Sequence, residues 1–164
     1  MEREEREGAA GEFRLAAVFD TVDPGRGPGF APDRAAVADP AERAALVAHL
    51  RAGAPVLMTP ALMDDVLDAS RKAVVPLNFR TDGEWIWTDT VTYYLEEYAV
   101  APEPGLLAHL RAGGVLGPGP DAETVERAAA FVLDPPEPAA PVWHVDGDGP
   151  AGQQGGEPSA AARP

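Results

Sequence analysis

Apolar and polar positions alternate most regularly over residues 74–88, where two apolar runs flank an Asp-Gly pair at 82–83. Asp-Gly between two such runs is a strong local signal for a β-hairpin, and we expect this pair to form the loop. Successive side chains of a strand point to opposite faces, so Leu77, Phe79 and Ile86 should share one core face. The other face then holds Asn78, Arg80, Trp85 and Trp87. An Arg beside two Trp on that face predicts a cation–π arrangement, either covered by a helix or exposed.

A helical pattern follows the hairpin directly. Val91, Tyr94, Leu95 and Tyr98 form one apolar stripe at helical spacing, which predicts a helix over residues 89–99. Capping and terminating residues indicate three more helices. We expect them at about 41–52, from after the chain break at Pro104 to about 112, and at 122–133, with Asp39 and Asp121 as N-caps. Residues 61–72 suggest a further short helix or a turn.

The remaining segments predict strands, a loop and two disordered ends. Residues 13–21 and 55–59 are short and apolar, as strands are, whereas residues 22–40 are dense in Pro and Gly and read as a long loop. We therefore expect a single α+β domain over residues 13–133, with an antiparallel sheet containing the 74–88 hairpin and packed by three or four helices. The acidic segment 1–12 and the Pro/Gly/Ala-rich tail 134–164 should be disordered.

The net charge of the chain disfavours two classes of binding partner. The chain has a formal net charge of −14, and its predicted folded part is acidic in its own right. A nucleic-acid binder should show a basic face, and an anionic membrane attracts basic segments, so both partners are disfavoured. Acidity suits a basic protein partner, or simply solubility. The chain has no Cys, no apolar run long enough to cross a membrane and no secretory signal, so we expect a cytoplasmic protein.

Few residues stand in patterns typical of catalytic, metal-binding or cofactor-binding sites. His49 and His109 lie near the ends of predicted helices, where the helix dipole favours them structurally. His144 stands in a short acidic segment that lacks the ligand spacing of a calcium loop. The three carboxylates Asp64, Asp65 and Asp68 are read as a solvated helix face. The Gly-rich run 24–29 lacks the Lys and Ser/Thr of a phosphate loop, so we predict no catalytic residue, metal or cofactor.

The aromatic segment is instead the best candidate for recognition. Aromatic side chains dominate the energetics of protein interfaces, so Trp85 and Trp87 are predicted as anchors. Charged neighbours would set the register and steer the encounter with the partner. The predicted partner-binding residues are Arg80, Asp82, Trp85, Trp87, Tyr93, Glu96 and Glu97.

The segment from Phe79 to Gly114 carries a resemblance. It resembles small proteins of high-GC bacteria that combine an RTDG-x-W-x-W hairpin, a YYL helix, an acidic-Pro linker and an LLAH helix. The matching residues are Phe79, Arg80, Thr81, Asp82, Gly83, Trp85, Trp87, Tyr93, Tyr94, Leu95, His109 and Leu110. Some proteins of this group look like immunity partners of polymorphic toxins, including NAD-degrading ones. The resemblance therefore implies a role in neutralising a cognate toxin.

Three function hypotheses follow. The leading one is a non-enzymatic protein-binding module, an immunity or antitoxin-like neutraliser of a cognate protein such as a basic toxin domain. The alternative is a small-molecule or nucleotide-binding regulatory domain, in which the 22–40 loop closes over a pocket lined by Trp and Tyr. The third is an enzyme that uses Asp or Tyr side chains. A partner search and a metabolite panel would separate the first two.

Overall fold

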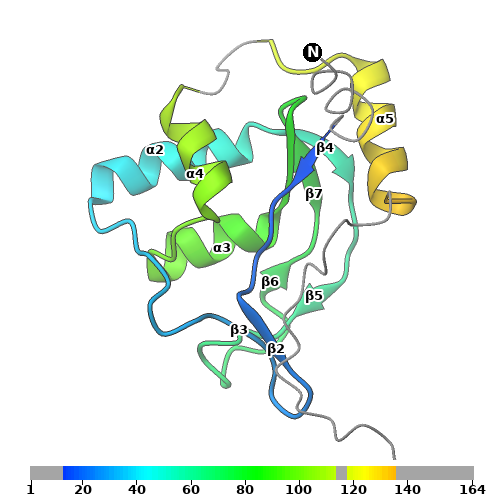
Figure 1. Cartoon of the computed structure of the whole chain (residues 1–164). Helices are drawn as coiled ribbons and strands as arrows, with labels where there is room; N and C mark the ends of the chain where they lie inside the picture. The colour runs from blue at the N-terminus through cyan, green and yellow to red at the C-terminus, as the bar shows by residue number, and fades with distance from the viewer. Residues whose placement is uncertain (1–12, 114–117, 136–164) are drawn as a thin grey trace, which may run out of the picture.

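Helices and short strands combine into an α+β domain, as expected (Figure 1). The computed structural model describes residues 13–113 and 118–135. The segments predicted to be disordered, 1–12 and 134–164, lie outside the described residues, except for residues 134 and 135. None of the helices in the described ranges is long and apolar enough to cross a membrane.

The central sheet has four strands in the order β1-β8-β7-β4. They are β1 (Arg14–Leu15), β4 (Ala54–Leu57), β7 (Phe79–Thr81) and β8 (Trp85–Thr88). Strand β7 pairs antiparallel with both β8 and β4, whereas β1 runs parallel to β8. The sheet is therefore mixed: the hairpin and β4 pair antiparallel, as expected, and β1 adds one parallel pairing. A tight turn forces antiparallel pairing only on strands that it joins, and β1 reaches β8 after about half the chain.

The β7–β8 hairpin forms where it was predicted, with its loop displaced by one residue. A loop formed by residues 82 and 83 alone would pair Arg80 with Trp85, whereas Arg80 pairs with Trp87. The displacement arises because the Asp82 carboxylate accepts hydrogen bonds from two backbone amides of the turn, at 3.0 and 2.9 Å, and so closes the turn from its first position. Gly83, with a φ of 102°, supplies the left-handed backbone that this turn requires. Each pairing partner moves by two positions, so every side chain keeps its predicted face.

Four helices begin and end close to the predicted positions. They are α2 (Pro40–Arg51), α3 (Asp89–Tyr98), α4 (Pro104–Arg111) and α5 (Ala122–Leu133). The predicted N-caps are confirmed, because the Asp39 carboxylate accepts from the Ala41 amide and the Asp121 carboxylate from the Thr124 amide. These caps satisfy amides that the first helical turn leaves without partners.

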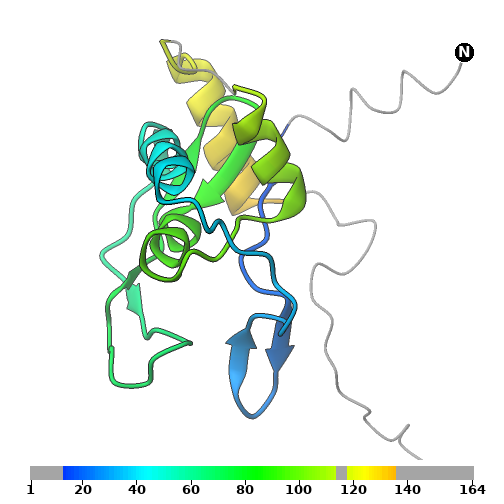
Figure 2. The ribbon, with the colours of Figure 1, turned by 90° about the vertical axis from the view of Figure 1, so that its left-hand side faces the viewer.

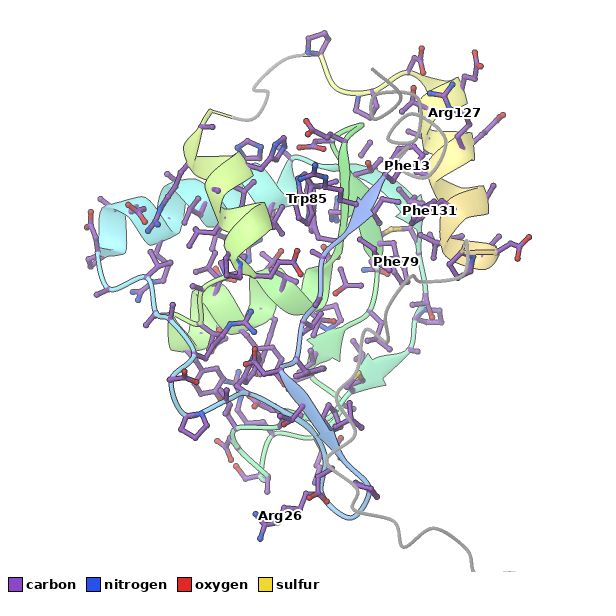
Figure 3. The ribbon with its side chains drawn as sticks, in the orientation of Figure 1. Phe13, Arg26, Phe79, Trp85, Arg127 and Phe131 are labelled. Atoms are coloured by element: carbon purple, nitrogen blue, oxygen red, sulfur yellow. The ribbon has the colours of Figure 1, made fainter. Side chains whose placement is uncertain are left out.

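Helices cover both faces of the hairpin. Trp85 and Trp87 pack into a cluster with apolar residues of α2, α3 and α4. On the opposite face, Ile86 and Phe79 pack with Phe13 and with α5 residues (Figure 3). The question left open by the sequence, whether a helix covers the tryptophan face, is thus answered: three helices do.

A smaller hairpin projects from the body of the domain, at the lower end in Figure 2. It consists of β2 (Thr21–Asp23) and β3 (Gly27–Gly29), which pair antiparallel, so the predicted loop 22–40 contains β3 and all of β2 except Thr21. The Asp23 carboxylate accepts from the amides of Gly25 and Arg26 and so closes the turn. Arg26 lies at the tip, directed away from the domain (Figure 3).

The segment predicted as a short helix or turn forms a strand and turns. Strand β5 (Leu62–Met63) pairs antiparallel with β6 (Val75–Pro76). Between them, the Asp65 carboxylate accepts from the amides of Leu67 and Asp68. Side chains that bond to nearby backbone in this way compete with helix formation. The predicted strand 13–21 is likewise divided, into β1 and the start of β2.

Candidate functional site

The two tryptophans predicted as interface anchors are core residues. Trp87 is fully buried and Trp85 is 4% exposed. The Trp87 indole Nε1 donates to the Leu50 carbonyl at 3.1 Å, which satisfies its only donor inside the core. Side chains buried to this degree offer a partner no surface. This burial corrects the prediction that they act as anchors.

Arg80 forms an ion pair in place of the predicted cation–π contact. Its Nε donates to the Asp89 carboxylate at 2.7 Å, and its Nη1 donates to the Gly53 carbonyl at 3.1 Å. The Trp85 ring is covered instead by Arg14, whose guanidinium carbon lies 5.8 Å from the ring centroid. Arg80 therefore connects β7 to the start of α3 and to the chain just after α2.

Tyr93 is hydrogen-bonded to a buried carboxylate, that of Asp65. The hydroxyls of Tyr93 and Tyr98 donate to Asp65 Oδ2 at 2.8 and 2.6 Å, and the Asp65 side chain has no exposed surface. Burial raises the pKa of this carboxyl, but the tyrosine and backbone hydrogen bonds outweigh burial and hold the pKa below its usual value. Burial and the bond to Asp65 raise the pKa of Tyr93. Asp65 is thus an interior hydrogen-bond acceptor, which corrects its assignment to a solvated helix face.

Glu96 and Glu97 are exposed on the last turn of α3. Glu96 pairs with Arg51 from the end of α2, and Glu97 pairs with Arg71 at 3.0 Å. The last turn of α3 itself contains no basic residue. The carboxylates of Glu96 and Glu97 therefore lie at the C-terminal end of α3, where the helix dipole is already negative. The basic residues that neutralise them come from other segments.

A pocket of about 310 Å³ lies along α3, from Asp89 at its start to Glu96 in its last turn, and we call it the α3 pocket. It brings together the end of α2, strand β7 and one polar stripe of α3. Its lining residues are Arg51, Pro76, Arg80, Asp89, Thr92, Tyr93 and Glu96. Of the predicted partner-binding residues, Arg80, Tyr93 and Glu96 meet here, whereas Glu97 is not among the lining residues.

Thr92, one of the lining residues, has a buried polar atom without a partner. The residue is 4% exposed, and its hydroxyl oxygen is fully buried with no hydrogen-bond partner among the described residues. Buried hydroxyls are normally hydrogen-bonded, so an exception calls for an explanation.

Asp82, the remaining predicted residue, lies at a second pocket, of about 470 Å³, between the hairpin loop and the start of α5. His109 from α4 donates through Nε2 to the Asp82 carboxylate, and its Nδ1 lies 3.7 Å from a Glu84 oxygen. Burial raises the pKa of Asp82, but amide and His109 hydrogen bonds outweigh burial and lower it below its usual value. With both ring nitrogens facing carboxylates, His109 ties α4 to the hairpin instead of serving as a free base.

The charges of Asp82 and His109 influence the pKa of His49. Burial lowers the pKa of His49; Asp82 raises it and His109 lowers it further. The buried Nε2 of His49 has no hydrogen-bond partner in the part of the chain that the structure describes. In the same residues, no group of three or more His, Cys, Asp or Glu is arranged to hold a metal ion.

Sequence reasoning missed four residues of the α3 pocket: Arg51, Pro76, Asp89 and Thr92. One signal could have found two of them. Residues 89, 92, 93 and 96 have the same helical spacing as the apolar stripe of α3, so they form a second, polar stripe. The approach of Arg51 from α2 depends on tertiary packing and leaves no such signal.

Comparison with known proteins gives no match: no family model, no curated protein and no solved structure is similar to this chain.

Proposed function

We propose that the protein is a non-enzymatic protein-binding module that neutralises a basic cognate protein, in the manner of an immunity protein or antitoxin. The observation that supports this most is the position of Glu96 and Glu97, both exposed at the negative end of α3. In this proposal the helix end and the adjoining α3 pocket form the recognition surface, with Tyr93 and Arg80 lining its side.

The energetics of these carboxylates favour an exchange of partners. Negative charge at a helix C-terminus opposes the helix dipole, so the two residues contribute little to the stability of α3. Their pairs with Arg51 and Arg71 are solvent-exposed, and exposed ion pairs are weak. A Lys or Arg of a partner can replace either arginine at small cost, and it gains the attraction of both the carboxylate and the helix end.

The overall charge supports the same proposal. The chain carries 27 acidic against 13 basic residues, an excess that accelerates encounter with a basic protein through long-range attraction. We place this encounter in the cytoplasm, where a chain without cysteine needs no oxidising compartment for its fold.

A capture experiment with matched variants tests the proposal. The tagged full chain is used at low salt in extracts of the native host, and bound proteins are identified by mass spectrometry. We expect one stoichiometric basic partner, which a high-salt wash releases and the double variant Glu96→Gln/Glu97→Gln fails to retain. The control, Glu123→Gln/Glu126→Gln, removes the same charge from exposed positions on α5 and should retain the partner. A partner that binds both double variants equally, or no partner at all, contradicts the proposal.

A further inference from the structure

We infer that an apolar ridge beside the α3 pocket extends the recognition surface, so that the whole surface fits a basic amphipathic helix of the partner. The ridge is the segment 58–62, and its large side chains are Met58 and Leu62. This inference rests on the proposed function and adds the chemistry of the partner's contacting segment. Apolar side chains of the partner pack on the ridge, and its Lys or Arg side chains reach Glu96 and Glu97.

Exposed apolar side chains are concentrated in this part of the domain. Five large hydrophobic side chains are exposed in the described residues, and three of them, Met58, Leu62 and Leu67, fall within ten positions of the chain. Met58 is 59% exposed and Leu62 is 50% exposed. No charged residue stands between Arg51 and Asp64. Single exposed hydrophobic residues are ordinary, whereas a group of them in one uncharged segment marks a site of interaction.

Strand pairing places Leu62 beside the α3 pocket. In the two-stranded β5–β6 sheet, Leu62 pairs with Pro76 and Met63 pairs with Val75. Paired residues share a face of the sheet, and successive residues alternate between the faces. Met63 and Val75 pack in a hydrophobic cluster with Tyr94. Leu62 therefore lies on the opposite face together with Pro76, which lines the α3 pocket.

Two hydrogen bonds hold the other end of the ridge near the same pocket. The Thr59 amide donates to the Asn78 side-chain carbonyl at 2.9 Å, and the Asn78 side-chain amide donates to the Asp89 carboxylate at 3.0 Å. Asp89 lines the α3 pocket and is the first residue of α3. Met58 precedes Thr59, so the ridge borders the pocket near the start of α3.

Acidic side chains lie at the other end of the pocket. Glu96 and Glu97 are 42% and 40% exposed, and each is paired with one arginine from another segment. Ion pairs at this exposure are weak, so a partner's Lys or Arg can compete for the carboxylates. The formal net charge of −14 opposes a second copy of this chain on the same surface and favours a basic occupant.

The spacing of the two regions suits a helix. The α3 pocket extends from Asp89 to Glu96, which on a helix corresponds to two turns and a rise of about 10 Å. Residues two turns apart on a partner helix have the same separation. One such helix can therefore place an apolar side chain on the ridge and a basic side chain at Glu96, as amphipathic helices do in grooves.

Fluorescence anisotropy with the full chain and two labelled peptides tests the inference. The first peptide consists of Leu and Lys, with Leu at helical spacing on one face. In the second peptide Gln replaces every Leu. We expect saturable binding of the Leu/Lys peptide and about tenfold weaker binding of the Gln/Lys peptide, because apolar contacts with the ridge are lost.

Substitutions at exposed positions make the test specific to the ridge. Met58→Gln and Leu62→Thr should each weaken binding of the Leu/Lys peptide about tenfold and leave binding of the Gln/Lys peptide unchanged. Leu133→Gln is the matched control, because it removes a 72% exposed apolar side chain from the end of α5. It should leave both affinities unchanged. The double variant Glu96→Gln/Glu97→Gln should weaken binding of both peptides.

Five outcomes overturn the inference. Three concern affinity: no saturable binding of the Leu/Lys peptide, equal affinity for the two peptides, and equal losses in Leu62→Thr and Leu133→Gln. The fourth is self-association in sedimentation velocity that Leu62→Thr abolishes, which would assign the ridge to a second copy. The fifth is tighter binding of the Leu/Lys peptide by Trp143→Ser, which would assign the ridge to residues 142–145 of the same chain.

The capture experiment separates this inference from the proposed function. A partner that Leu62→Thr retains and Glu96→Gln/Glu97→Gln loses overturns the inference alone. Absence of any partner from the extract contradicts the proposed function, whereas the peptide titrations still decide whether the ridge and the α3 pocket bind a basic amphipathic helix.

Discussion

The indole nitrogen of Trp87 donates a hydrogen bond to the carbonyl of Leu50 at 3.1 Å, and both residues are fully buried. This bond joins β8 to the last turn of α2. The chain passes so close to the indole at Gly53 that a Cβ there would lie 2.5 Å from Trp87 Cζ2. The packing of α2 against the sheet therefore depends on the indole ring of Trp87 and on Gly53, which has no side chain.

Gly53→Ala should destabilise the protein by about 2 kcal/mol, the usual cost of overpacking a filled core. Urea denaturation measures the effect. The double variant Gly53→Ala/Trp87→Phe should be less destabilised than the sum of the two single variants, because phenylalanine lacks the indole atoms that the new Cβ meets. Gly29→Ala, with its nearest contact at 3.7 Å, is the control. Additive effects in the double variant would rule out this contact as the cause.

Asp65→Asn should reduce the free energy of unfolding by about 2–3 kcal/mol, because an amide NH2 would face donors that now bond to a carboxylate. The affected donors are the hydroxyls of Tyr93 and Tyr98 and the amides of Leu67 and Asp68. Asp64→Asn, at the exposed neighbouring position, should have the smaller effect. Equal effects of the two substitutions in chemical denaturation would contradict the role assigned to Asp65.

Ala99→Gly should stabilise the protein by about 1 kcal/mol. Ala99 ends α3 in the left-handed conformation, with a φ of 60°, which costs energy for any residue that has a Cβ. Ala112 ends α4 with a φ of −70°, so Ala112→Gly should leave stability unchanged or reduce it. Thermal unfolding of the two variants compares them directly, and a lower melting temperature for Ala99→Gly would refute the strain argument.

His49 should make the protein less stable as the pH falls. Burial lowers its pKa in the folded state below the ordinary value of 6.5. Below 6.5 the unfolded chain takes up a proton that the folded protein binds less readily, so the equilibrium shifts towards unfolding until the folded pKa is passed. Above 6.5 His49 is neutral in both states and this effect is absent.

Denaturation of the wild type and of His49→Gln at about pH 7.5 and about pH 5.5 measures this contribution. The wild type should lose more stability between these pH values than the variant. Equal losses would show that other groups carry the pH dependence.

The sequence was sufficient for features that local chemistry determines. Asp39 and Asp121 cap the helices that they were predicted to cap, because a side chain and an amide two or three residues away suffice for a cap. The faces of the β7–β8 hairpin were also correct, although the loop was displaced by one residue. A displacement that moves each partner by two positions does not alter which side chains share a face.

Features that depend on distant segments were not predictable in this way. The parallel pairing of Arg14 with Trp85 joins residues from opposite halves of the chain. Asp65 was read as solvated, with Asp64 and Asp68, because Arg71 and Lys72 are close in the sequence, whereas the α3 tyrosines that donate to it are distant in the sequence. The α3 pocket was predicted only in part for the same reason. Its residues on α3 share a helical spacing that the sequence shows, whereas Arg51 belongs to another helix and approaches through tertiary packing.

Coverage of the β7–β8 hairpin from both sides constrains the order in which the chain can mature on the ribosome. Once residue 113 has emerged from the ribosome, α2, α3 and α4 are complete and can close over the tryptophans. Ile86 and Phe79 stay uncovered until α5, which begins at Ala122, can pack against them. Nascent chains that stall in this interval carry an uncovered apolar sheet face, the kind of surface that chaperones hold and proteases act on. Truncation before α5 should therefore produce an aggregation-prone remnant instead of a smaller, independently folded protein.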